Sequence, residues 1–311
     1  MNRFTCLDEM WHSALRDVIN SGEAVESRNG GSREIIGWSG TLTDAGRNWL
    51  LTPGRAASPV YGCAELLWYL SRSDRVSLIT DYAPSYAKFA EADGRAHGAY
   101  GRRLETNIPH FDQLFLVVQA LSAHPESRQA VVSLWHPSDL LHAVDVSRKD
   151  LPCTLTWQFF VRGNRLHMVA TMRSNDIWLG MPYDVFCFTM IQHLVAAELG
   201  LEVGSYTHNV GSLHLYDKNA KAYDCDRSDF TVYQHCWTVR DGFAQAAQAL
   251  HEWSLVRTPM VPTAPSHGGP MRDVIEIVAS HHTGTDPVVC SPLFMKGLQV
   301  YADNRRAGPR R

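Results

Sequence analysis

The chain has 311 residues, of which 45% are apolar and 20% are charged, and its net charge is −3. This composition is typical of a globular protein with a sizeable core, and it excludes a global basic field for nucleic acid. No apolar run is long enough to predict a membrane span or a signal peptide, and seven cysteines without a CxxC pair indicate neither a zinc site nor a disulfide framework. We therefore expect a cytoplasmic protein without a metal.

The N-terminal third contains two helical patterns and one extended pattern. Apolar residues recur at helical spacing over 4–19, and a second helix is predicted at 58–70. Between them, a Gly-rich loop with two arginines (27–33) precedes a strand at 34–42. Such a loop can hold an anion, although a surface hairpin turn is the simpler interpretation. Glu65 lies among apolar residues of the second helix, which places it either at the surface or in a pocket that raises its pKa.

The middle of the chain begins with an aromatic stripe. Tyr82, Tyr86 and Phe89 recur three to four residues apart and predict a helix at 82–92, with the stripe as core or as a stacking wall for a flat cofactor. A turn or loop (94–103), an amphipathic helix (107–122) and a strand of buried type (130–135) are expected next.

The second half of the chain completes an α+β pattern. A hairpin joins strands 154–161 and 166–172, a long apolar helix covers 183–199, and a strand covers 205–216. Helices are expected within 229–254 and a loop at 262–270. Because helices and strands mix without regular βαβ alternation, we predict one α+β domain with one large sheet.

The residues with the clearest chemistry surround this hairpin. Cys153 follows Pro152 at the start of the apolar strand, and Arg173-Ser174 and Asp184 come later in the chain. A thiol is a good nucleophile and leaving group, and a cation beside it favours the thiolate. The set could therefore grip and attack a small anionic ring compound.

Several short segments in this order resemble the thymidylate synthase family, over about residues 28–219. They are Glu65–Leu70, Ala99-Tyr100-Gly101, Ser127-Arg128, Pro152-Cys153, Gln158-Phe159, Arg173-Ser174-Asn175-Asp176, Leu179–Tyr183 and Gly211–Tyr216. The resemblance implies an α+β catalytic domain (1–290) whose large mixed sheet packs against its copy in a homodimer, followed by a divergent, partly flexible basic tail (291–311). It also implies a pyrimidine nucleotide as substrate and 5,10-methylenetetrahydrofolate as cofactor.

The resemblance assigns a role to each matching position. Cys153 matches the nucleophile that adds to C6 of the pyrimidine, and Glu65 and Tyr100 match the proton-transfer network. The implied substrate ligands are Arg28, Arg173 and Ser174 for the phosphate, Arg128 for the phosphate across the dimer interface, His214 and Tyr216 for the sugar, and Asn175, Asp176 and Asp184. The implied folate contacts are Tyr86, Phe89, Asp176 and Gly180.

One departure from the family bears on the base. Asp184 stands in Pro182-Tyr183-Asp184, where the family has an asparagine that pairs with uracil. An aspartate can accept from the exocyclic amine of cytosine and share a proton with N3, and the same change marks the family's cytidylate hydroxymethylase branch. The alternative is an aspartate that only caps the helix.

Other departures affect the phosphate and the solvent. Gln129 replaces a phosphate arginine, Thr154 replaces a histidine and Ser212 replaces an aspartate of the family. The C-terminus also lacks the short apolar end that closes over the folate. A wetter site agrees with addition of water instead of hydride transfer.

The sequence therefore predicts a 5-hydroxymethylase of CMP or dCMP, with the composition and a nucleoside-antibiotic pathway favouring CMP. Thymidylate synthesis from dUMP is the alternative enzyme activity. A non-catalytic nucleotide- or mRNA-binding relative is the alternative of a different class.

Overall fold

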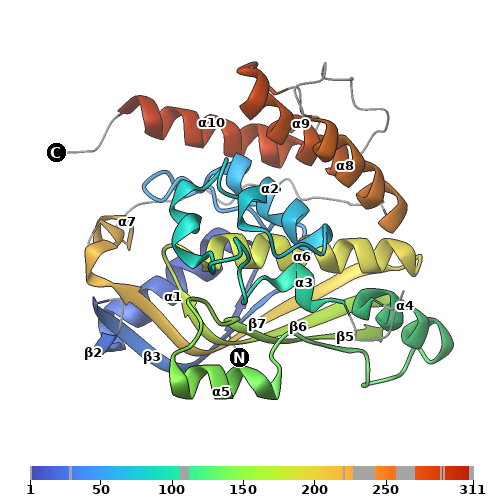
Figure 1. Cartoon of the computed structure of the whole chain (residues 1–311), viewed down its shortest axis with the longest axis horizontal. Coiled ribbons are helices and arrows are strands. Elements are labelled where there is room, and N and C mark those ends of the chain that lie inside the picture. The colour runs from blue at the N-terminus through green and yellow to red at the C-terminus, as the bar shows by residue number, and fades with distance from the viewer. Residues whose placement is uncertain are drawn as a thin grey trace.

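One mixed β-sheet organises the computed structural model, which describes residues 2–27, 30–105, 112–219, 221–226, 242–256, 270–287, 289 and 291–307 (Figure 1). Its seven strands follow the order β1-β3-β7-β6-β5-β4, with β2 paired to β3. The parallel pairs are β1/β3 and β6/β7, and the other pairs are antiparallel. The strands are β1 (Asn2–Phe4), β2 (Glu23–Ser27), β3 (Gly30–Leu42), β4 (Val131–Ser133), β5 (Thr154–Arg162), β6 (Arg165–Asp176) and β7 (Glu202–Tyr216). This confirms the predicted α+β class with a large mixed sheet.

The β5/β6 hairpin positions the central motifs. Its turn residues Gly163 and Asn164 have φ values of 56° and 58°, the left-handed conformation that matches the twist of a two-residue hairpin. The register between β5 and β6 shifts between Thr154 and Thr156. Cys153 therefore precedes a strand irregularity, a feature that commonly re-aims side chains beside active sites.

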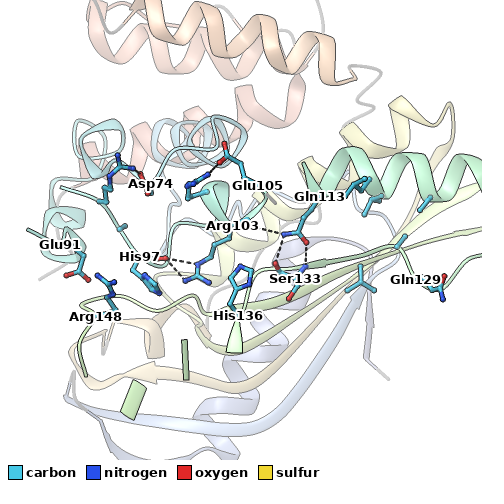
Figure 2. A pocket seen from close by; sticks show the side chains of 18 of the residues that line it. Asp74, Glu91, His97, Arg103, Glu105, Gln113, Gln129, Ser133, His136 and Arg148 are labelled. Carbon is cyan, nitrogen blue, oxygen red and sulfur yellow. Dashed lines mark hydrogen bonds and ion pairs between the residues drawn. The ribbon is translucent and has the colours of Figure 1, made fainter. Parts of the chain in front are cut away.

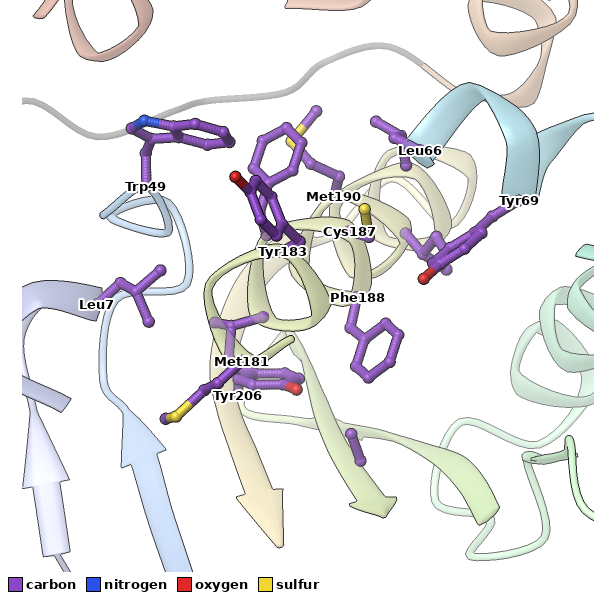
Figure 3. Packing of buried hydrophobic residues seen from close by; sticks show 14 of the residues in the cluster. Leu7, Trp49, Leu66, Tyr69, Met181, Tyr183, Cys187, Phe188, Met190 and Tyr206 are labelled. Atoms are coloured by element: carbon purple, nitrogen blue, oxygen red, sulfur yellow. The ribbon is translucent and has the colours of Figure 1, made fainter. Parts of the chain in front are cut away.

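Helix α6 (Met181–Glu198) connects β6 to its parallel neighbour β7 and forms the centre of the core. Every residue from 181 to 196 is buried. A helix that is apolar on all sides must be enclosed on all sides. Figure 3 shows this enclosure, with Tyr69 on α2 and Tyr206 on β7 on different sides of the helix. Trp49 packs edge-on against Phe186, with ring centroids 4.8 Å apart.

The remaining helices cover the sheet unequally. In Figure 1, α2, α6 and the C-terminal helices lie above the sheet and α5 lies below it. No helix in the described ranges is long and apolar enough to cross a membrane. The helices are α1 (Leu7–Ser21), α2 (Pro59–Leu70), α3 (Tyr100–Arg103), α4 (Gln113–Ala123), α5 (Pro137–Asp145), α7 (Ala222–Asp226), α8 (Phe243–Val256), α9 (Pro270–Thr283) and α10 (Pro292–Ala307), with 3-10 turns at Val76–Leu78, Pro84–Phe89 and Asp217–Asn219.

Several predicted elements differ in detail. The aromatic stripe forms a 3-10 turn instead of an α-helix, because Pro84 begins it and the backbone is extended again at Ala90. Strand β4 is an edge strand instead of a fully buried one. Phe4 belongs to β1 and not to the first helix, and the predicted loop 94–103 ends in α3. The sequence analysis also missed α5.

Other predictions fall at the margins of the described ranges. The described residues of the predicted Gly-rich loop belong to the antiparallel strands β2 and β3, with Ser27 paired to Gly30. Helix α4 begins at Gln113, where the Asp112 carboxylate accepts the Leu114 N–H at 2.8 Å. Residues 106–111, 227–241 and 257–269 lie outside the described ranges. The division at residue 290 stays a prediction, and α10 occupies most of the predicted tail.

Candidate functional site

The thiol of Cys153 lies beside a guanidinium. Arg173 on β6 approaches Cys153 Sγ with Nη2 at 3.7 Å, and its backbone N–H donates to the Cys153 carbonyl at 2.8 Å. Burial raises the pKa of the thiol to about 11, Arg173 opposes this shift, and Asp150 and Asp184 add to it. We expected Arg173 to favour the thiolate. It does so, but the effect of burial on the pKa of the thiol is larger.

The same guanidinium holds the chain that leads into the nucleophile. Arg173 Nε donates to the Pro152 carbonyl at 3.0 Å, and Nη2 donates to the Leu151 carbonyl at 3.1 Å. Its head group lies 5.8 Å from the centroid of the Trp135 ring. The donors of a guanidinium are fixed in one plane. The orientation of Arg173 is therefore coupled to the position of the main chain before Cys153, and so to the position of the thiol.

Glu65 occupies a pocket and not the surface, which settles the two interpretations of its sequence context. The side chain is 6% exposed, and the Tyr61 hydroxyl, one helical turn earlier on α2, donates to Oε1 at 2.7 Å. Burial raises the pKa of Glu65 to about 7, while hydrogen bonds from Tyr61 and Tyr69 oppose the shift. The carboxyl can therefore bind and release a proton near neutral pH.

Asp184 lies in the first turn of α6 and is also buried. Asn175 Nδ2 donates to Asp184 Oδ2 at 2.7 Å. Burial raises the pKa of Asp184 well above its usual range, Glu65 and Asp176 raise it further, and the Asn175 hydrogen bond opposes the rise. The carboxyl is therefore favoured in its neutral form, which can donate and accept at once.

Asp176 is the last residue of β6, and one of its two carboxylate oxygens accepts hydrogen bonds. Its Oδ1 accepts the backbone N–H groups of Trp178 and Leu179 at 2.8 Å and 3.0 Å. Its Oδ2 is buried and has no hydrogen-bond partner in the described part of the chain. An unpaired buried acceptor is costly, so this oxygen fits a ligand that offers N–H groups.

Tyrosines line the space between these groups. Tyr100 accepts the backbone N–H of Thr154 at 3.2 Å on its hydroxyl, next to the nucleophile. Burial raises the pKa of Tyr86, and Asp150, Glu65, Asp184 and Cys153 add to that rise. Its hydroxyl is therefore within electrostatic reach of these four groups. Its ring packs edge-on against Phe89, with centroids 5.1 Å apart. Both predicted folate-contacting aromatics are thus neighbours at one wall.

The structure brings only some of the predicted phosphate and sugar ligands close to one another. Ser174 on β6 is in register with Ser212 on β7, and Asp176 is in register with His214. The rings of His214 and Tyr216 pack edge-on, with centroids 4.9 Å apart. Arg128 is exposed before the edge strand β4. Arg28 lies outside the described residues.

The substituted positions have local partners. Ser212 donates its hydroxyl to Glu34 on the adjacent strand β3. Thr154 has a buried hydroxyl without a hydrogen-bond partner in the described ranges. Gln129 is exposed, and its backbone N–H donates to Ser127 Oγ at 3.1 Å. Asp150, Trp135 and Tyr61 join the site without having been predicted, because their proximity depends on the chain path.

A pocket of ≈ 770 Å³ lies along α4 and β4, and none of the predicted ligands lines it (Figure 2). Two of its lining residues, Arg103 and His97, bind the buried Asp139 of α5. Arg103 donates to both oxygens of Asp139 at 2.7 Å and 2.9 Å, and His97 Nε2 lies 2.8 Å from Asp139 Oδ1. Because these charges satisfy one another, we interpret the network as a structural brace of α5.

The mixed sheet, the enclosed crossover helix and a thiol beside a guanidinium define an α+β protein with a candidate nucleophile at the start of a central hairpin. The fold is similar to that of the thermostable thymidylate synthase A from Bacillus subtilis, with a TM-score of 0.63 and 24% identity over 76% of this chain and 89% of that chain. The family pattern described as Thymidylate synthase matches residues 9–229. The chain belongs to the thymidylate synthase family. Membership indicates a folate-dependent transfer to a pyrimidine nucleotide.

Proposed function

We propose that the protein hydroxymethylates C5 of CMP, or of dCMP, with methylenetetrahydrofolate and water as the other substrates. The observation that carries this proposal is Asp184, a buried carboxyl of raised pKa where the family has an amide. A neutral carboxyl can donate to N3 of cytosine and accept from its exocyclic amine. An ionised carboxylate facing uracil O4 would set two acceptors against each other, at a cost of about 1–3 kcal/mol.

Different residues of this chain carry out different parts of the proposed reaction. When bound, methylenetetrahydrofolate supplies the one-carbon unit, and the unpaired Asp176 Oδ2 and the wall of Tyr86 and Phe89 would hold it. Cys153 forms the Sγ–C6 bond, which makes C5 nucleophilic towards the one-carbon unit. After C5 has lost its proton and the carrier has left the transferred methylene, water adds to that methylene and Sγ leaves C6. Glu65 titrates near pH 7 and relays the protons that these steps exchange.

Methylation of dUMP is the competing function. A neutral Asp184 also matches uracil if the proton sits on the other oxygen, because an acid group is a donor at one oxygen and an acceptor at the other. The family resemblance favours dUMP, whereas the aspartate favours cytosine. A non-catalytic relative is the third candidate, and the thiol–guanidinium contact argues against it.

Release of tritium from C5-labelled CMP, dCMP and dUMP tests these functions in one assay. We expect release from CMP or dCMP and a product heavier by formaldehyde. Release from dUMP alone, with dihydrofolate visible by its absorbance, would establish the competing activity. No release from any nucleotide, combined with tight nucleotide binding, would favour the non-catalytic relative.

We also propose a homodimer in which Arg128 reaches the phosphate in the partner's site. Arg128 is exposed, and its backbone carbonyl accepts Gln158 Nε2 at 2.8 Å, which fixes the chain and leaves the guanidinium outward. Mixing inactive Cys153→Ala and Arg128→Ala proteins should restore activity, because mixed dimers contain one complete site. Failure to restore activity in a dimer that exchanges subunits would refute this arrangement.

A further inference from the structure

Three buried side chains continue the hydrogen bond that Asp184 receives. Asn175 Oδ1 lies 2.9 Å from His208 Nε2, and His208 Nδ1 lies 2.7 Å from the Tyr206 hydroxyl. Asn175 is 3% exposed, and His208 and Tyr206 are fully buried. This series of hydrogen bonds therefore runs from β7 through β6 to the first turn of α6, and its inner members are shielded from solvent.

The direction of these hydrogen bonds follows from the innermost group. In the described part of the chain, the Tyr206 hydroxyl meets no hydrogen-bond partner other than His208 Nδ1, so it donates its proton there. Burial lowers the pKa of His208 to about 3, so the ring is neutral and its proton lies on Nε2. His208 then donates to Asn175 Oδ1, which turns the Asn175 amide N–H towards Asp184.

A glycine makes room for the last link. A Cβ added at Gly180 would lie 2.9 Å from Asn175 Nδ2 and 3.1 Å from Asp184 Oδ2. A side chain at position 180 would therefore push against both members of the hydrogen bond. The close approach of Asn175 to Asp184 depends on this glycine at the N-terminus of α6.

We propose that Asn175, oriented by His208 and Tyr206, is a specificity-determining positioning residue that decides which oxygen of Asp184 carries the proton. Because Oδ2 accepts the Asn175 N–H, the proton of the neutral acid resides on Oδ1. The acid then presents one fixed donor–acceptor pattern to the base. This inference rests on the proposed function, and it assigns that fixed pattern to N3 and the exocyclic amine of cytosine.

The relay resolves the ambiguity of a neutral acid. Without a neighbour that distinguishes its two oxygens, a carboxyl group could present its proton to cytosine N3 or to uracil O4. An apolar side chain at 175 would remove the distinction and leave Oδ2 without its donor. The expected consequence is a loss of discrimination between the bases.

The relevant titration occurs among several groups that face Asp184. Glu65 on α2 and Asp176 on β6 contribute to its raised pKa. The groups whose own pKa values are raised in turn by Asp184 are Cys153, Cys187, Tyr69, Tyr86, Tyr100 and Tyr206. Loss of the Asn175 hydrogen bond, which opposes the rise, should move the alkaline limit of CMP binding to higher pH. A purely structural role of Asn175 would not move that limit.

Calorimetric binding of CMP and UMP to the full-length protein, between pH 6 and 9, tests the proposal. We expect Asn175→Leu to lower the CMP-to-UMP affinity ratio at least about tenfold and to shift the alkaline limit of CMP binding to higher pH. Tyr206→Phe removes the innermost donor with little change in shape, and should lower the ratio by about threefold. It also serves if Asn175→Leu fails to fold.

Asn48→Leu is the matched control. Asn48 is a fully buried asparagine whose Nδ2 donates at 2.8 Å to Oγ1 of Thr189 on α6, the helix that also carries Asp184. The Asn48→Leu variant should leave the base preference unchanged. Equal ratios in wild type, Asn175→Leu and Tyr206→Phe would overturn the inference while leaving cytidylate binding intact. A wild-type preference for UMP or dUMP would overturn the proposed function itself, and the inference with it.

Discussion

The two ends of the candidate site are built differently. At the base-reading end, Asp184, Asn175, His208 and Tyr206 are buried and form a continuous set of hydrogen bonds within one chain. At the phosphate end, Arg128 is exposed and Arg173 donates to backbone carbonyls. If these residues have their proposed roles, base recognition is organised before the substrate arrives, whereas phosphate recognition requires rearrangement of Arg173 or a contribution from the partner subunit.

The largest effect should come from Cys153→Ala, which lies between the two ends. Tritium release from the nucleotide should fall by at least about 10⁴-fold, because the Sγ–C6 bond of the proposed mechanism cannot form. Affinity for CMP should change by less than about threefold, since both ends of the site remain. Cys63→Ala, which removes a fully buried thiol, is the control. Retained turnover in Cys153→Ala would contradict every catalytic interpretation.

Asp184→Asn should break the base-reading end selectively. The ratio of CMP to dUMP turnover should fall by about 10³-fold, because an amide offers uracil the complementary pair and leaves cytosine with a mismatch. Turnover ratios measured with equal concentrations of the two nucleotides report the change directly. If the variant keeps its preference for CMP, Asp184 does not read the base.

Glu65→Gln should reduce tritium release by about 10²-fold and should flatten the pH dependence of stability. The pKa of Glu65 is raised from 4.5 to about 7, so the folded state holds a proton more tightly than the unfolded state. Stability from this group is complete below pH 4.5 and is lost as pH rises through 7, a change of about 3 kcal/mol.

Urea unfolding at several pH values between 4.5 and 7.5 measures this contribution. Wild type should lose more free energy of unfolding over that window than Glu65→Gln does. Glu23→Gln, at an exposed acid of β2, should behave as wild type. An identical pH profile in Glu65→Gln and wild type would place the titration on other groups, such as Asp8, whose pKa burial raises to about 6.

The smallest effect should come from strengthening the phosphate end. Gln129→Arg adds a cation beside Arg128 and should lower the KM for CMP by about threefold to tenfold, more strongly at low salt. The preference for CMP over dUMP should not change, because the base-reading end is untouched. Glu23→Gln makes the net charge more positive by the same amount at another exposed position and controls for net charge. An unchanged KM at low salt would show that position 129 does not face the phosphate.

Much of the fold follows from local pattern. The apolar run 183–199 could only be an enclosed helix, and Gly163 with Asn164 specifies the hairpin that leads from Cys153 to Arg173. Helix α5 was not predicted, although Leu140, Leu141 and Val144 recur at helical spacing; these side chains are exposed, so the helix does not present them to the core. Strand β4 resembled a central strand because sequence does not reveal which strand lies at an edge.

The site was predictable where its residues are adjacent in short motifs and not where the fold joins distant ones. Arg173, Ser174, Asn175 and Asp176 are consecutive, so one segment placed four of them. The approach of Asn175 to His208 depends on the parallel pairing of β6 with β7, which periodicity does not encode. A polar pair spaced two apart on the buried face of a strand, such as Tyr206 and His208, was the signal available.

Arg173 has a consequence for substrates that lack a phosphate. Its guanidinium donates to the carbonyls of Leu151 and Pro152 and contacts the thiol that follows them. A phosphate that attracts these donors must loosen their hold on the main chain leading to Cys153. If Arg173 binds the phosphate as proposed, anion binding and release of the main chain before Cys153 are coupled, and a nucleoside without a phosphate would leave these hydrogen bonds in place.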